Sequence, residues 1–520
     1  MDNTVMPNYE KVFCEKTEKE NMLDFALPEY MPSISKIIKA DAQPKITDKS
    51  IQNDKVTLEC EAVYNIVYVS DFKNKLKSIQ CKSEFTCEFP CAGLSERVGD
   101  DPVIYASAFT NSCSCKILNN RKIALKSKIS VCADVLDLKY IPVMCTNDSE
   151  DENQYQYLEE NIESAEVMNL QDMSRLVNEE LKVDDSMPDV SEIIYAAGSV
   201  CIENATAETD NVKVMCSLEF HCLYESRNEN DESEYITFIK KIPFSCEYEW
   251  PGIDSSYSVL ACADVYSLSC DASIDNYGEN RNITVSSLIK FNISAFRNAE
   301  GKYAKDVYST KCAVDFSRKN FTLEKFYAVI SDNVFAEEKI KADMRGISDI
   351  LDTNIKIKFF QPEIKDSSVC IPAKGVLSVL GMSDSGELRA EEIAFGMKIS
   401  SNELSERLGR DFSKYVFFCC DELCSHECVL HNGELILKMN IIQRCAVLEK
   451  YQISVVCDIS ESKENDENFS KQTFALYYPD KDDTVWSVAK SHRVSGDSIR
   501  TYNKLNGDSI SDKKVIIIRE

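Results

Sequence analysis

Six side chains that can ligate a metal ion occur within 13 residues of this chain. They are Cys419, Cys420, Cys424, His426, Cys428 and His431. Thiolate and imidazole groups are ligands that zinc prefers, but structural zinc sites usually present Cys-x2-Cys pairs, which this segment lacks. On a β-strand Cys424, His426 and Cys428 share one face. We therefore predict that these side chains pack in a core, and that the chain holds no metal and no other cofactor.

No residue spacing predicts catalysis. The chain has only four histidines and no His-Glu-x-x-His, Gly-x-Ser-x-Gly or phosphate-binding Gly-Lys-Ser/Thr motif. Cys113 or Cys115 could act as a nucleophile only with a histidine from another domain, because no histidine occurs in the first 220 residues. We therefore predict no catalytic residues and a protein that is not an enzyme.

The composition restricts the class of partner. The 87 acidic and 59 basic residues give a net charge of −28, which disfavours direct binding to nucleic acid and to anionic lipid. The first residues, Met1–Pro7, show neither a basic region nor an apolar run, and no apolar stretch is long enough for a membrane helix. We therefore expect no export signal, no membrane insertion and a reducing compartment in which the 23 cysteines are free thiols.

Internal repeats organise most of the chain. The segment Met31–Ile38 recurs as Met187–Ile194 and, in weaker form, as Met344–Leu351. Leu94–Gly99 returns as Leu404–Gly409. A period of this length is too long for a solenoid unit and predicts tandem domains.

The hydrophobic pattern predicts how each repeat is built. A proline opens the first two segments, and Ile34, Ile37 and Ile38 have the spacing of a short amphipathic helix. Alternating strands follow, with hairpin turns expected at 119–121 and 432–434. The fold class we predict is mainly β: three sandwich-like repeats with short helices.

Acidic, apolar-poor runs mark the linkers. One lies at 147–153 and the other at 461–468. The domain boundaries that we predict are 1–145 (N-terminal tail and first repeat), 146–163 (linker), 164–330 (second repeat), 331–460 (third repeat), 461–472 (linker) and 473–520 (terminal module).

The terminal module has its own pattern. Residues 473–478 alternate as a strand, and Asp483 is placed to cap a helix from Thr484 to about His492. Ser495 is placed to cap a second helix whose inward side chains are Ile499 and Tyr502, and the apolar run at 515–518 predicts a second strand. The expected order is βααβ.

This pattern resembles the LysM domain, which usually binds peptidoglycan or chitin. The resemblance implies a ligand groove between the loop before the first helix and the loop after the second. Asp482 stands where LysM domains usually have glycine, so we expect a reshaped groove that contacts protein rather than sugar. The predicted partner-binding residues are Asp483, Thr484, Trp486, Ile499, Tyr502 and Asn503. Trp486 could instead pack against the flank of its own domain.

The repeats resemble the SPOCS domain of endospore-forming Firmicutes. The resemblance rests on Pro188–Ile194 and on Phe244–Tyr248 before Trp250–Gly252. Together with a LysM-like C-terminus, the order of domains resembles SipL-like spore coat morphogenetic proteins of clostridia. That resemblance implies a non-enzymatic adaptor in the mother-cell cytoplasm, at the forespore surface. It also implies binding to the coat basement-layer ATPase, stage IV sporulation protein A, through the LysM domain, with other coat proteins as further partners.

Two alternatives stay open. The first is a peptidoglycan- or carbohydrate-binding cell-wall protein. The second is an enzyme that uses the Cys/His-rich segment of the third repeat.

Overall fold

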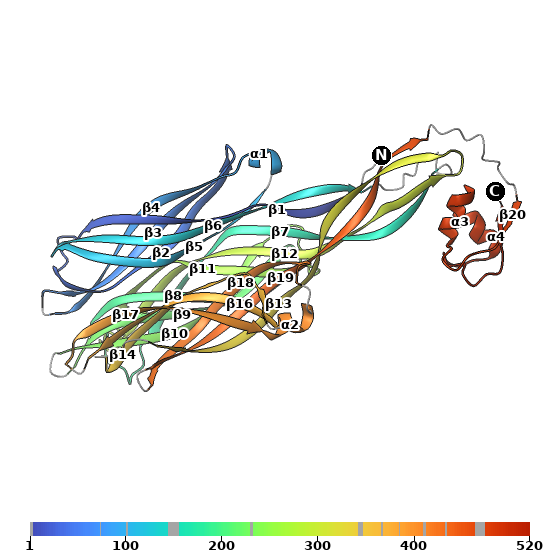
Figure 1. Ribbon diagram of the computed structural model, residues 1–520. Coiled ribbons are helices and arrows are strands. Elements are labelled where there is room, and N and C mark those ends of the chain that lie inside the picture. The colour runs from blue at the N-terminus through green and yellow to red at the C-terminus, as the bar shows by residue number, and fades with distance from the viewer. Residues whose placement is uncertain are drawn as a thin grey trace.

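Three antiparallel β-sandwiches and a small C-terminal module make up the structure (Figure 1). The structure is a computed structural model that describes residues 4–519 apart from 73, 100–101, 144–154, 229–231, 342–346, 366–367, 384, 409–411, 432–433 and 463–473. The prediction of a mainly β fold with sandwich-like repeats is confirmed. Among the described residues, no helix is long and apolar enough to span a membrane.

The first two repeats share one topology, in which each sandwich pairs two three-stranded sheets. In the first repeat the sheets are β1-β6-β5 and β2-β3-β4, and in the second they are β7-β12-β11 and β8-β9-β10. The bounds in the first repeat are β1 (Thr4–Ala26), β2 (Ile34–Gln52), β3 (Lys55–Ser70), β4 (Leu76–Pro90), β5 (Val103–Asn119) and β6 (Lys122–Val143). Those in the second are β7 (Tyr155–Lys182), β8 (Glu192–Glu208), β9 (Asn211–Arg227), β10 (Ser233–Glu249), β11 (Ser258–Ser273) and β12 (Asn282–Ser309).

The third repeat follows the same plan with an extra short strand. One sheet is β13-β19-β18, and in the other β16 pairs with β14, β15 and β17. The bounds are β13 (Val314–Ile340), β14 (Asp349–Phe359), β15 (Glu363–Lys365), β16 (Ser368–Met382), β17 (Leu388–Ser401), β18 (Tyr415–His431) and β19 (Glu434–Glu461). The boundary expected between 330 and 331 falls inside β13, and the linker expected at 146–163 overlaps β7 from Tyr155 onward. Residues 144–154 and 463–473, which include half of the first predicted linker and most of the second, lie outside the described residues.

Inward side chains at every second position of the central strands fill the cores of the first two repeats. On β3 every second side chain from Val56 to Tyr68 is buried inside its own sandwich, and β9 repeats this pattern from Val212 to Tyr224. The turn predicted at 119–121 joins β5 to β6, whereas the turn at 432–434 falls mostly on residues outside the described part.

The short helices predicted at the start of the repeats are wrong, because these segments belong to strands β2, β8 and β14. In β2 the pairing register slips at Ser35 and again at Ile38, which are β-bulges. Each bulge shifts the phase of the alternation, so Ile34 and Ile37 both reach the core while Ile38 points to the other side. Two bulges thus produce the apolar spacing that is typical of a helix. The structure instead places short helices at the other repeated motif, as α1 (Leu94–Arg97) and α2 (Asn402–Leu408).

The motif that begins at Met31, Met187 and Met344 joins the three repeats to one another. Each repeat has a bulged residue at the equivalent position, and these are Ile38, Ile194 and Leu351. All three belong to one apolar cluster, together with the equivalent central-strand residues Val67, Leu223 and Leu380. The residues that follow the bulges, Lys39, Tyr195 and Asp352, also interact: Lys39 Nζ lies 5.2 Å from the Tyr195 ring centroid, and Tyr195 donates a hydrogen bond to Asp352.

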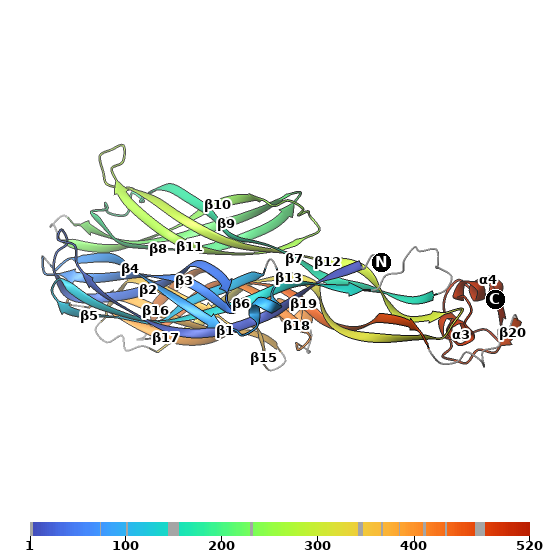
Figure 2. The ribbon, with the colours of Figure 1, turned by 90° about the horizontal axis from the view of Figure 1, so that it is seen from above.

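Long strands extend from the sandwiches toward the C-terminal module. In Figures 1 and 2 the ends of β7, β12, β13 and β19 extend beyond the sandwiches as an arm, and the module lies at its tip. The module consists of β20 (Phe474–Tyr477), α3 (Val485–His492), α4 (Gly496–Asn503) and β21 (Ile516–Arg519), with β20 paired antiparallel to β21. This is the βααβ order that the sequence predicts.

Candidate functional site

The start of α3 differs in detail from the sequence prediction. Thr484, not Asp483, is the N-cap: its hydroxyl accepts from Ser487 N at 3.1 Å, and Ser487 Oγ accepts from Thr484 N at 3.0 Å. Asp483 Oδ2 instead accepts from the Tyr477 hydroxyl and from Asp480 N, each at 2.8 Å. Asp483 therefore fixes the turn that leads from β20 into the helix.

Two further predicted contact residues serve the fold of the module. Ile499 is fully buried among Val485, Val488 and Ile516. The Asn503 side chain donates to the Ile517 carbonyl at 2.7 Å and accepts from Ile517 N at 2.6 Å. Asn503 thereby joins the end of α4 to β21.

Trp486 packs against the second repeat. Its indole N–H donates to Asp306 Oδ2 at 3.0 Å, and the ring meets Tyr308 edge to face with 4.9 Å between centroids. Lys490, one helical turn further on, forms an ion pair with the same Asp306 carboxylate at 2.6 Å. The buried Tyr308 hydroxyl donates to the Val494 carbonyl at 2.7 Å. We call this set of contacts, which joins residues 486–494 to Asp306 and Tyr308 near the end of β12, the docking contact.

Electrostatics favour the docking contact. The Asp306 side chain is only 15% exposed, and burial acts to raise its pKa. Hydrogen bonds from Lys490 and Trp486 outweigh burial, so the pKa of Asp306 lies below its usual value. Arg318 adds a second cation at 3.3 Å. The Asp306 carboxylate is therefore charged at neutral pH, and most of its hydrogen bonds come from Trp486 and Lys490 of the module.

One face of the module remains open. Phe474 and Leu476 on β20 point away from the helices and are 57% and 54% exposed. Tyr478 is 72% exposed and Tyr502 is 44% exposed. The guanidinium of Arg519, the partner of Phe474 in the β-ladder, lies 5.4 Å from the Tyr502 ring centroid. We call Phe474, Leu476, Tyr478 and Tyr502 the open apolar face.

The two loops that the LysM resemblance implies as a groove are joined by their backbones. Thr484 and Ser509 form a β-bridge, and Val485 N donates to the Asp508 carbonyl at 2.8 Å. The prediction that Tyr502 points inward is wrong: its side chain is 44% exposed, and it is the most exposed of the six predicted contact residues. Phe474, Leu476, Asp306 and Tyr308 were missed by the sequence prediction. The alternation of two exposed apolar residues with Ala475 and Tyr477 indicates a strand that is apolar on both faces, and this signal could have identified the first two.

The Cys/His cluster of the third repeat lies on β18 and reaches the second repeat. Cys424 forms a disulfide with Cys201 on β8, and Cys420 forms one with Cys262 on β11; the Cα–Cα distances are 5.1 and 5.7 Å. The prediction that the cysteines are free is therefore wrong for these four. Spacing could not reveal the pairs, because the partners lie 223 and 158 residues apart.

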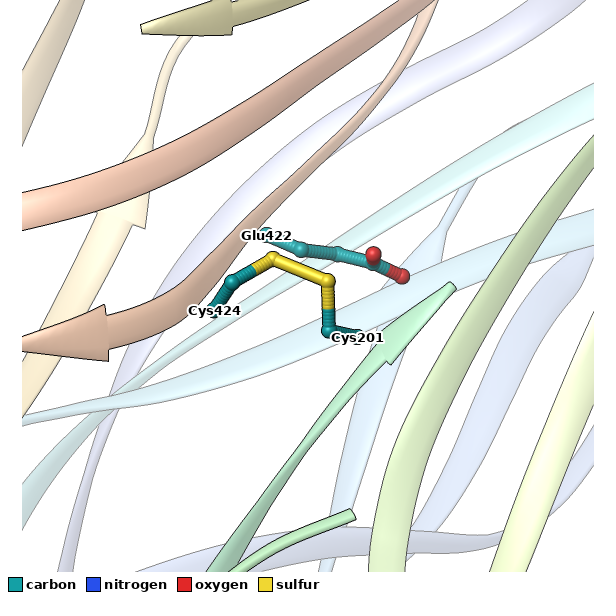
Figure 3. A group of neighbouring side chains, drawn as sticks. All are labelled: Cys201, Glu422 and Cys424. Carbon is teal, nitrogen blue, oxygen red and sulfur yellow. A yellow bond between two sulfur atoms is a disulfide. The ribbon is translucent and has the colours of Figure 1, made fainter. Parts of the chain in front are cut away.

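The disulfide at Cys201 and Cys424 lies beside Glu422, as Figure 3 shows. These three residues form a group with the composition of a metal site, but both sulfurs are already bonded to each other. Glu422 Oε2 accepts from Arg444 at 2.8 Å and from Ile202 N at 2.9 Å, and burial raises the pKa of Glu422 to about 7. The group thus joins the second and third repeats through the disulfide and through hydrogen bonds that Glu422 and Arg444 form with the backbone of Ile202 on β8.

Comparison with known families agrees with this architecture. The family model described as SipL, SPOCS domain matches residues 33–118 and 189–275, which together are about a third of the chain. The matches cover β2 to β5 and the equivalent strands β8 to β11. No curated protein and no solved structure matched the chain. SipL is a family of non-enzymatic sporulation proteins. The chain therefore contains two tandem SPOCS domains and is similar to SipL-like proteins.

Proposed function

We propose that the chain is a spore coat morphogenetic adaptor. Its C-terminal module binds the coat basement-layer ATPase, stage IV sporulation protein A, and the three sandwiches present further coat proteins around the forespore in the mother cell. The chain acts without catalysis. The two SPOCS matches support the spore coat role, and the open apolar face of the module is the observation that supports the contact.

The open apolar face has the properties of a protein interface. Aromatic side chains are enriched at the centre of such interfaces, where a few buried residues supply most of the affinity. Phe474, Leu476, Tyr478 and Tyr502 are all exposed on a module of fewer than 50 residues. Arg519 at its edge adds a cation beside the aromatic ring of Tyr502.

Trp486 has a different role in this proposal. Because its indole is bonded to Asp306 and packed on Tyr308, it holds the module at the tip of the arm while the open apolar face points outward. Substituting Trp486 then changes partner binding indirectly, through the position of the module. Asp483, Thr484, Ile499 and Asn503 support the same surface from within.

The experiment is a binding measurement between the full chain and the purified coat ATPase. Phe474→Glu or Leu476→Glu on the open apolar face weakens binding at least about 30-fold, the loss typical of an interface hot spot above 2 kcal/mol. Phe335→Glu is the matched control, since Phe335 is 79% exposed on β13 of the body. Equal affinity of the Phe474 and Phe335 variants contradicts the proposed contact. Saturable binding to purified peptidoglycan that Phe474→Glu leaves intact would favour the cell-wall alternative.

A further inference from the structure

A cavity of about 660 Å³ lies where the three repeats meet. One wall is the outward face of β2, β3 and β4, on which Asp41, Asn65 and Gln80 stand side by side in register. Segments of β8 and β11 from the second repeat and of β14 from the third complete the lining. This volume is within the range of small-molecule sites, which is roughly 300–1,000 Å³.

The cavity is rich in lysine although the chain is strongly acidic. Its lining includes Lys39, Lys45, Lys82 and Lys356. Lys356 is paired with Asp41, and Lys82 is paired with Glu61 at 3.1 Å. Burial lowers the pKa of Lys39, and the neighbouring carboxylates of Asp41 and Asp352 oppose this shift only in part. The lining also includes Asp41 and Asp271, so lysines outnumber carboxylates four to two around this cavity in a chain whose net charge is −28.

Two lysines that have no ion pair within the described residues lie around Tyr266 at one end of the cavity: Lys45 belongs to the lining, whereas Lys290 contacts Tyr266 from outside the lining. Lys45 Nζ lies 4.9 Å from the centroid of the Tyr266 ring, and Lys290 Nζ lies 4.3 Å from the same centroid. Tyr266 is the extra residue of a β-bulge in β11, which leaves it unpaired in the ladder. Lys45 and Lys290 form no ion pair with any carboxylate in the described part of the chain.

Burial makes the charge of Lys45 costly. Desolvation and the neighbouring Lys82 lower the pKa of Lys45, and Glu61, which opposes them, is already bonded to Lys82. An anion placed among these ammonium groups restores the balance of charge and gains charge-assisted hydrogen bonds. The amide groups of Gln43 and Asn65 line the adjoining wall and supply further polar contacts.

We infer that this cavity binds a small organic anion with several carboxylate or phosphate groups, held at the Tyr266 end by Lys45, Lys82 and Lys290. Lys45 and Lys82 come from the first repeat, and Tyr266 and Lys290 come from the second. The bound anion therefore bridges two repeats and stabilises their packing. This site is separate from the C-terminal module and does not depend on the function proposed for it.

Calorimetric titration and thermal unfolding of the full chain test the inference. The probes are citrate, a polycarboxylate, and pyrophosphate, a polyphosphate, each compared with sodium chloride at matched ionic strength. At least one probe binds and raises the unfolding temperature, and the stronger probe identifies the anionic group. Lys45→Gln and Lys290→Gln each weaken binding about tenfold or more, the loss expected for a hydrogen bond to a charged group. Lys240→Gln, on the exposed side of β10, is the matched control and leaves binding unchanged.

Two outcomes overturn the inference. One is that neither citrate nor pyrophosphate binds the unsubstituted chain more tightly than chloride. The other is that the Lys45 and Lys290 variants bind like the Lys240 control. If Lys45→Gln lowers the unfolding temperature without any probe and no probe binds, the lysines serve only the packing of the repeats, and the inference is wrong.

Discussion

Replacing Asp306 with alanine releases the C-terminal module from the arm. The change removes the acceptor of the Trp486 indole N–H and the anion of the Lys490 ion pair. A hydrogen bond to a buried charged group contributes about 1.5–3 kcal/mol. The Lys490 side chain is 37% exposed, so solvent screens its pair and we assign it less than about 1 kcal/mol. We expect docking to weaken by about 2–3 kcal/mol, which is about 30- to 150-fold in the equilibrium constant.

Tryptophan fluorescence can measure this release, because the chain has only two tryptophans. Trp250 is 6% exposed in the core of the second repeat, so Trp250→Phe leaves Trp486 as the reporter. In that background Asp306→Ala shifts the emission to longer wavelength and increases quenching by acrylamide. Asp315→Ala is the control, since Asp315 is an exposed carboxylate at the start of β13. Unchanged quenching in the Asp306 variant, or an equal change in the control, refutes the docking contact.

Three further predictions concern pH, the centre of the molecule and the disulfides. The pKa of Asp306 is lowered in the docked state, so the stabilisation of docking by this carboxylate is complete above the usual aspartate pKa of about 3.9 and is lost as pH falls through the lower docked value. Quenching of Trp486 by acrylamide should therefore rise in this acidic range, and the rise should be absent in Asp306→Ala. Leu223→Ala, at the junction of the three repeats, should lower the free energy of unfolding in denaturant by about 2–5 kcal/mol, and a loss below about 0.5 kcal/mol contradicts the shared cluster. Cys262→Ser, which removes the disulfide to Cys420, should lower the free energy of unfolding by about 2–5 kcal/mol without reductant and should change it little in the presence of reductant. Cys14→Ser is the control and should have no effect. Peptide mapping that finds Cys262 and Cys420 as free thiols without reductant contradicts this disulfide.

The sequence predicted the fold class and the order of domains better than the positions of the individual helices and strands. The alternation in β3 and β9 and the repeated motifs were enough to predict tandem β-sandwiches, because inward side chains must recur at every second position. The expected helices failed at Ile34–Ile38, because two bulges imitate the apolar spacing of a helix. Bulges depend on the partner strand, which lies on a different part of the chain.

The functional site was predictable only where it is local. The βααβ order and the burial of Ile499 follow from short-range patterns. The contact of Trp486 with Asp306 joins residues 180 positions apart, and no nearby pattern marks either partner. The roles of Asn503 and Thr484 likewise depend on the exact ends of strands and helices, which a periodic pattern leaves uncertain by several residues.

Deleting residues 473–520 tests the central proposal most directly. Each sandwich has a core that contains no residue of the module, so the truncated chain should keep its β-rich circular dichroism spectrum. Affinity for the coat ATPase is then measured for the full and the truncated chain under the same conditions. The proposed function predicts that truncation abolishes binding while the body stays folded. Full affinity in the truncated chain contradicts the proposal that the C-terminal module is the contact.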